Sequence, residues 1–122
     1  MREYTFQEYR AMFPDAARED CPLQKTLALF QGRWTLQVIF ELSKAKNLRF
    51  GELKKRIPRV TNTMLTSTLR NLEKCNLVTR IQYNEIPPHV EYALSEAGRD
   101  MYPIFVEMAK WGKKHLTQDA AR

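Results

Sequence analysis

The sequence RVTNTMLTSTLRNLEKC, residues 59–75, predicts a helix with two unlike faces. Leu65, Leu69 and Leu72 recur at the i, i+4, i+7 spacing that places them on one apolar stripe. Thr61 can accept a backbone hydrogen bond through its hydroxyl group, which would cap the N-terminus of this helix. The opposite face carries hydroxyl groups and cations and no acid, in the side chains of Thr63, Thr66, Ser67, Arg70 and Lys74.

A helix face of this composition has the chemistry that DNA recognition needs. Arginine can donate paired hydrogen bonds to guanine in the major groove, and threonine or serine can contact bases or phosphates. The alternative is a polar surface helix without a partner, because motifs of this kind also occur by chance. On the first interpretation, the helix over residues 62–74 reads bases through Thr63, Thr66, Ser67 and Arg70.

The distribution of charge supports a phosphate-binding role for the same region. The 122 residues include 20 basic and 14 acidic side chains, a formal net charge of +6. Between Lys44 and Arg80 there are ten cations and two acids, net +8, whereas residues 1–20 carry a net −2. Positive charge concentrated around one helix is typical of a nucleic-acid-binding surface. The alternative is a basic face that only keeps the protein in solution.

Three further helices are predicted before this one. Pro22 suits the first turn of a helix, a second helix is expected over residues 34–43, and a third over residues 51–57 after a very short strand near residues 48–50. Pro58 ends the third helix, and the polar helix follows after a tight turn. Two short helices in this arrangement, the second basic on its outer face, indicate a helix-turn-helix.

Two alternating segments follow the helix-turn-helix. Residues 77–83 and 89–94 are rich in β-branched and aromatic side chains, and the residues between them indicate a turn. They predict a β-hairpin, which makes the fold a winged helix-turn-helix. Phosphate contacts are expected from cations and polar groups around the polar helix and on the wing, namely Lys54, Lys55, Arg56, Arg59, Thr61, Lys74, Arg80 and His89.

The C-terminal segment predicts a helix with more apolar surface than one small domain needs. Ser95 caps it, Pro103 is expected to kink it, and apolar residues cover more than half of its circumference beyond that point. A helix packing only on its own domain needs a stripe of about 100°. We therefore expect a homodimer, with the alternative that residues 1–20 cover the helix within one subunit. The expected interface residues are Phe6, Tyr9, Phe13, Phe105, Met108 and Trp111.

Other classes of function lack sequence support. There is no nucleophile–base pair, carboxylate dyad, metal-ligand spacing or glycine-rich phosphate loop, so neither an enzyme nor a cofactor or metal is expected. The sequence has no run of 18 apolar residues, no secretory signal and no CxxC pair, and we expect a cytoplasmic protein without a membrane partner. A winged helix used only for protein contacts is the alternative function, although protein interfaces deplete lysine.

Motifs along residues 21–116 match a known pattern. They include CP at residues 21–22, GRWTL at 32–36, RFGEL at 49–53, LVTR at 77–80 and, most specifically, YxExPPxVEYxLSxxG at 83–98. With these motifs the chain resembles the HxlR family of bacterial transcriptional regulators, which are relatives of the MarR type. Asn62 and Thr63 depart from the proline and the cation that many members carry at these positions.

The resemblance implies a mainly α-helical fold with a small β-hairpin wing, α+β overall, and a dimer that binds operator DNA. It divides the chain into an N-terminal arm (1–20), a winged helix-turn-helix domain with a C-terminal dimerisation helix (21–116) and a tail (117–122). The expected function is sequence-specific regulation of transcription by a homodimer on a palindromic operator in double-stranded DNA. The resemblance names no small-molecule effector.

In several HxlR-like proteins the cysteine that matches Cys21 senses oxidants or electrophiles. A position at a helix N-terminus makes a thiol more nucleophilic, whereas the neighbouring acids Glu19 and Asp20 oppose this effect. The alternative is a small buried packing residue. The second cysteine, Cys75, is expected in the core.

Overall fold

The computed structural model describes residues 3–15 and 20–116, and the predicted tail lies outside these ranges. The chain divides after Arg33 into two compact units. The first unit contains α1 (Phe6–Met12) and α2 (Pro22–Leu29), and α2 begins at Pro22 as expected from the sequence. Thr5 caps α1 by accepting the Glu8 N–H at 3.1 Å, and Cys21 is the residue that precedes α2.

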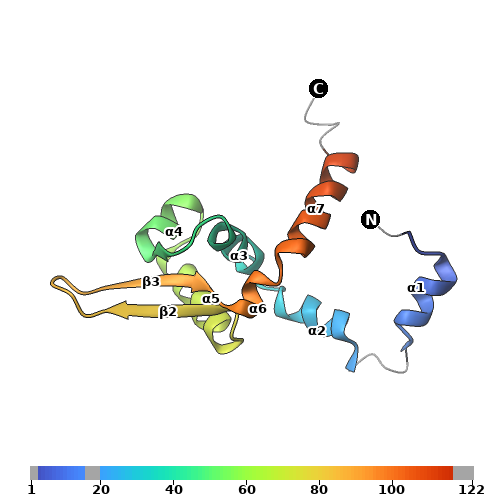
Figure 1. The fold of residues 1–122 in the computed structure, drawn as a ribbon, viewed down its shortest axis with the longest axis horizontal. Coiled ribbons are helices and arrows are strands. Elements are labelled where there is room, and N and C mark those ends of the chain that lie inside the picture. Colours follow the sequence, from blue (N-terminus) through green and yellow to red (C-terminus); the bar gives the residue numbers. More distant parts are fainter. Residues whose placement is uncertain (1–2, 16–19, 117–122) are drawn as a thin grey trace. The chain divides into compact units, whose positions relative to one another are not determined.

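The second unit is a helical body with a three-stranded sheet (Figure 1). The strands are antiparallel in the order β1-β3-β2, so the hairpin of β2 and β3 is extended on one side by the short β1. No helix within the described ranges is long and apolar enough to cross a membrane. The elements in chain order are α3 (Thr35–Ser43), β1 (Leu48–Arg49), α4 (Phe50–Arg56), α5 (Asn62–Lys74), β2 (Val78–Tyr83), β3 (His89–Leu94), α6 (Glu96–Arg99) and α7 (Tyr102–His115).

The core of this unit lies between α3, α4, α5 and one face of the sheet. Leu65, Leu69 and Leu72 of α5 are at most 1% exposed and pack with Ile39 and Leu42 of α3 in this core. Their burial confirms the apolar stripe predicted from the sequence. Because the stripe faces inward, the opposite side of α5 faces solvent.

Both ends of α5 are capped, one by a side chain and the other by backbone hydrogen bonds. Thr61 Oγ1 accepts the Met64 N–H at 3.1 Å, so the predicted cap and the predicted bounds are confirmed. At the other end Asn76 adopts a left-handed conformation with φ 59°, which asparagine tolerates better than most residues. The Asn76 and Leu77 N–H groups donate to Glu73 and Leu72 carbonyls, each at 3.0 Å, which is a Schellman motif.

Two predictions from the sequence were wrong. Cys75 is exposed, because it follows the last turn of α5 and lies off the buried leucine stripe. The C-terminal helix is interrupted and not kinked: α6 ends at Arg99 and α7 begins at Tyr102. Pro103 lies in the first turn of α7, where its missing N–H needs no acceptor, so it starts a helix instead of bending one.

Candidate nucleic-acid interface

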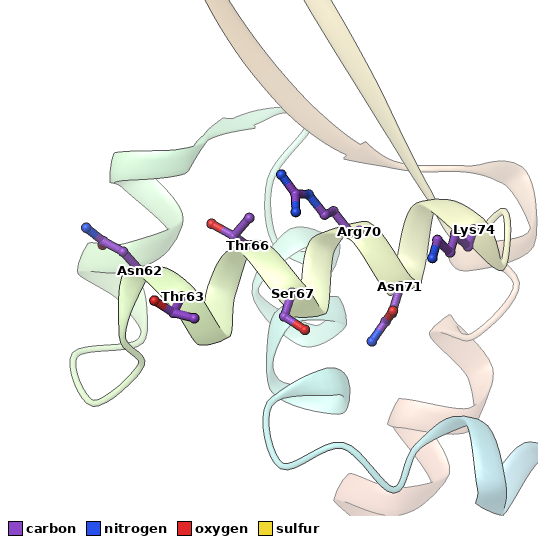
Figure 2. A pocket seen from close by; sticks show the side chains of 7 residues that line it. All are labelled: Asn62, Thr63, Thr66, Ser67, Arg70, Asn71 and Lys74. Carbon is purple, nitrogen blue, oxygen red and sulfur yellow. The ribbon is translucent and has the colours of Figure 1, made fainter.

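The solvent-facing side of α5 forms a hollow of about 430 Å³ (Figure 2). Its side chains follow the four-residue spacing of a helix, and Figure 2 shows Thr66 and Arg70 on one side of the axis and Ser67 and Asn71 on the other. None of the lining residues is acidic. We call this surface the polar face, and it consists of Asn62, Thr63, Thr66, Ser67, Arg70, Asn71 and Lys74.

The polar face brings together all four residues that the sequence predicted as base readers. It also contains two asparagines, Asn62 and Asn71, which are not among the predicted base readers. The spacing from Ser67 to Asn71 could have identified the second of them. A carboxamide can donate to and accept from adenine in the major groove, so this surface offers chemistry for both adenine and guanine.

The predicted phosphate-binding cations lie on α4, in the turn before α5, at the last residue of α5 and on β2. One of these cations has an acidic partner: the Arg56 guanidinium lies 3.9 Å from the buried Glu41 carboxylate on α3. Thr61 uses its hydroxyl oxygen as a cap, which leaves the hydroxyl hydrogen for a further acceptor. The described part of the chain places no acid within ion-pair distance of Lys54, Lys55, Arg59, Arg70, Lys74 and Arg80.

The two predicted contacts on the wing lie on opposite faces of the sheet. Alternate residues of a strand point to the same face of the sheet, so Arg80 shares a face with the buried Val78. That face of the sheet packs against the helices. His89 lies on the other face. Only Arg80 is therefore on the same side of the sheet as α5.

His89 is held between two acids. Its Nε2 lies 3.0 Å from Glu91 Oε2, its Nδ1 lies 3.7 Å from Glu85 Oε2, and its ring stacks on Tyr83 with centroids 4.6 Å apart. The side chain is 16% exposed. A phosphate contact by His89 stays a prediction, and these partners do not favour it, because two carboxylates repel a phosphate.

Glu91 links this histidine to the loop before β1. Asn47 Nδ2 donates to Glu91 Oε1 at 3.0 Å. The hydrogen bond with His89 lowers the pKa of the Glu91 carboxyl, with further contributions from Asn47 and from the positive charge of Arg49, while partial desolvation acts in the opposite direction. Glu91 is therefore held as a carboxylate.

The remaining predicted sites lie on other elements. Cys21 is 8% exposed and borders a hollow of about 270 Å³ beside Phe13. The α7 helix has no buried residue, and Figure 1 shows it extending away from the sheet. Within the described residues, no group of three His, Cys, Asp or Glu side chains could hold a metal ion. The predicted interface residues that are exposed are Phe6, Tyr9, Met108 and Trp111, whereas Phe13 and Phe105 are half-buried.

These elements define a winged helix-turn-helix: α4 and α5 joined by a tight turn, with the β2–β3 wing directly after them. The chain belongs to the HxlR family, because the HxlR-like helix-turn-helix pattern matches residues 29–120. It is a transcriptional regulator with a helix-turn-helix domain, and this class is not enzymatic. The family resemblance and the fold class predicted from the sequence are confirmed.

Individual relatives agree with this assignment. YdzF of Bacillus subtilis, described as an uncharacterised HTH-type transcriptional regulator, is 39% identical over 94 residues, which cover 77% of this chain and 86% of that protein. A MarR-family transcriptional regulator from Porphyromonas gingivalis W83 is similar in structure, with a TM-score of 0.73, 40% identity, and coverage of 80% of this chain and 95% of that one. The oxidised form of the redox regulator HypR gives a TM-score of 0.70 at 37% identity, with 78% and 97% covered.

Replacing Glu91 with glutamine should lower the free energy of unfolding at neutral pH and have less effect in acid. The pKa of Glu91 lies below its ordinary value of 4.5, so the carboxylate stabilises the fold above that pH. This stabilisation is lost as the pH falls through the lower, native pKa. Urea unfolding of both proteins in steps from pH 7 to pH 3 measures the difference.

Glu85→Gln is the matched control, because the Glu85 side chain is 65% exposed and its distance from His89 is longer. Its effect should be small at every pH. A stability difference for Glu91→Gln that stays constant across the series would contradict the prediction.

Proposed function

We propose that this protein is a sequence-specific DNA-binding regulator that acts as a homodimer on a palindromic operator in the cytoplasm of a bacterial cell. The observation that carries the proposal is the polar face of α5, which has no acid, together with six cations on α4, α5, β2 and the turn before α5 that have no ion-pair partner in the described residues. Such a surface is costly in charge repulsion unless a polyanion covers it. The polar face is carried by a single helix, and the major groove of DNA is wide enough to admit one α-helix.

In this proposal, base reading and phosphate binding fall to different residues. Arg70 has a forked guanidinium suited to guanine, and Asn71 has a carboxamide suited to adenine. The shorter side chains of Thr63, Thr66 and Ser67 make the remaining base contacts. Phosphates are held by cations and by the Thr61 hydroxyl, which fix the register of the helix on the duplex. The cations are Lys54, Lys55, Arg56, Arg59, Lys74 and Arg80.

The proposed dimer rests on the apolar surface of α7. Met108 is 51% exposed and Trp111 lies on the same exposed helix, while Phe105 packs on Phe40 of α3 with ring centroids 5.9 Å apart. The aromatic residues of α1 would complete the interface, as residues 1–20 form the arm in the proposed domain division. A two-fold axis would place two α5 helices about 34–36 Å apart, in successive major grooves.

A winged helix that binds only proteins is the alternative. Interfaces between proteins deplete lysine and are seldom so rich in one sign of charge. The six cations without acidic partners therefore favour DNA over a protein surface.

A redox response through Cys21 is a second candidate function, and it is supported by the similarity to the redox regulator HypR. A hollow lined by Phe13, Pro14, Asp15 and Gln24 borders the thiol, which gives a small oxidant a place to approach. Hydrogen peroxide would transfer one oxygen atom to the sulfur, giving a sulfenic acid and water. The added oxygen would disturb packing, since Cys21 is buried.

Arg70→Ala should weaken binding to the preferred operator by about 1–3 kcal/mol and relax preference at one position of each half-site. The operator is first selected from random duplexes, and anisotropy titrations then compare selected and scrambled DNA. Lys54→Ala is the matched control: it should weaken binding to all sequences and reduce the slope of log affinity against log salt by about one. Equal loss on both DNAs would make Arg70 a phosphate contact.

Met108→Asp should convert the dimer into a monomer at micromolar concentration, because it places a charge in an apolar interface. Met108 is exposed within one chain, so the fold should survive. Sedimentation measures the mass, and Lys110→Asp, on the far side of α7, should remain dimeric. Wild-type protein that sediments as a monomer would refute the dimer.

Peroxide treatment should change operator affinity in a Cys75→Ser variant, which keeps Cys21 as its one thiol. Cys75 has to be removed because its thiol is exposed to peroxide and directly follows α5, so its oxidation would be a second source of any response. Cys21→Ser is the reciprocal variant and should not respond. If the two variants respond equally, or neither responds, Cys21 is a packing residue.

A further inference from the structure

A second hollow lies beside the first turn of α5. It measures about 260 Å³ and is formed by the start of α3, the end of α4 and the turn that follows α4. It shares no lining residue with the polar face. We call it the turn hollow, and its lining residues are Trp34, Gln37, Arg56, Ile57, Pro58 and Arg59.

Trp34 fixes where the turn hollow lies relative to α5. Its indole Nε1 donates to Met64 Sδ at 3.3 Å. Met64 comes one residue after Thr63 of the polar face and one before the buried Leu65, so it lies on the flank of the helix between those two sides. Figure 2 shows Thr63 near one end of the polar face and Lys74 at the other. The turn hollow therefore borders the flank of α5 at its N-terminal end.

The turn hollow combines apolar surface with two positive groups. Trp34 is half-buried and, with Ile57 and Pro58, provides the apolar surface. The positive groups are the guanidiniums of Arg56 and Arg59. Arg59 is exposed and has no acid within ion-pair distance among the described residues. A ligand that matches this site has an apolar body and an anionic group.

The Arg56 guanidinium is held at the turn hollow without losing its hydrogen-bond donors. Its Nη1 lies 3.9 Å from Oε1 of Glu41, whose side chain is 8% exposed. This distance is within ion-pair range but too long for a hydrogen bond, so Glu41 attracts the guanidinium and leaves its N–H groups available. Two closer groups occupy the carboxylate, Lys44 Nζ at 3.2 Å and Gln37 Nε2 at 3.2 Å. Arg56 can therefore donate to an anion in the hollow while it stays beside Glu41.

The position of the turn hollow matches a wall of the major groove. An α-helix with its side chains is about 10–12 Å across, and the groove is about 12 Å wide. A helix whose polar face lies on the groove floor therefore brings its flanks against the sugar–phosphate backbone. Each unit of that backbone carries an apolar deoxyribose face and a phosphate anion, which are the two features that the turn hollow can bind.

We propose that the turn hollow seats one sugar–phosphate unit of each half-site, with the phosphate between Arg56 and Arg59 and the deoxyribose against Trp34. The inference rests on the proposed DNA-binding function and adds Trp34 to its contacts. The seated unit lies at the end of the half-site read by Thr63, away from the position read by Arg70. A small free anion with an apolar body has the same chemistry, and a competition experiment separates the two sources.

Single methylphosphonates placed symmetrically along the operator test the proposal, because each replaces a charged phosphate by a neutral group. The full chain is titrated as wild type and as Arg59→Ala. This substitution should raise Kd about three- to tenfold per subunit on every sequence and reduce the salt slope by about one per subunit. On the wild type, one symmetric pair of methylphosphonates should cost a similar factor. That cost should be lost in Arg59→Ala, since both changes remove the same contact.

Lys74→Ala is the matched control, because Lys74 lies at the other end of α5 and has no acidic partner in the described ranges either. Its cost should add to that of the same methylphosphonates. Arg56→Ala should behave as Arg59→Ala does. Circular dichroism melts check its fold, because it removes a cation from the buried Glu41. If Arg56→Ala fails to fold, the Arg59→Ala cycle decides alone.

Tryptophan fluorescence reports on the contact of Trp34, one of two tryptophans in the chain. Operator binding should reduce acrylamide quenching of the wild type, because the deoxyribose covers the indole. Trp34→Phe should show no such change. An equal change in both proteins would place the shielding at Trp111 and overturn the contact with Trp34.

Additive costs for Arg59→Ala and every methylphosphonate would overturn the proposal, and so would different phosphates for Arg56 and Arg59. At constant ionic strength, 2-deoxyribose 5-phosphate should displace the operator from wild type and from Arg59→Ala alike at matched saturation. Displacement from the wild type alone would assign the turn hollow to a free anion and overturn the backbone contact. Failure of the wild type to select any DNA sequence would instead refute the proposed function.

Discussion

The burial of three leucines on α5 is the constraint on which the rest of this structure depends. Leu65, Leu69 and Leu72 are almost fully removed from solvent, and each contributes about 1.5–3 kcal/mol to stability on burial. A small domain is stable by only about 5–15 kcal/mol in total. Rotating α5 by one residue would expose part of this stripe, so the leucines fix which side chains face outward. The polar face is thus defined by the core beneath it.

The sequence was sufficient for those elements whose causes are local. The bounds of α5 follow from the Thr61 cap and from the leucine period, and both act within a few residues. Pro103 was misplaced because proline is compatible with two situations, a kinked interior and a first turn. The choice depends on the α6–α7 break after Arg99, and no local pattern marks that break. Cys75 was misjudged for a similar reason, since its exposure depends on where the helix ends.

The same distinction between local and long-range causes applies to the residues of the candidate site. Thr63, Ser67 and Arg70 could be found from the sequence because they lie opposite the leucine stripe on a helical wheel. Asn71 also lies on that side, four residues after Ser67, so the same helical spacing was sufficient to identify it. The hydrogen bond between Asn47 and Glu91 could not be found, because it spans 44 residues of sequence. Contacts of that range depend on strand pairing, which the sequence pattern does not specify in register.

The Schellman motif at Asn76 has a mechanical consequence. Its two backbone hydrogen bonds hold Asn76 and Leu77 against the end of α5, and only three residues, 75–77, separate α5 from β2. Helix and wing therefore share one rigid frame and have no slack with which to accommodate an irregular duplex separately. In the proposed complex of a dimer with DNA, any misfit between a half-site and this frame has to be absorbed elsewhere, by curvature of the DNA or by the angle between the two subunits. The cost of bending then becomes part of how operators are ranked.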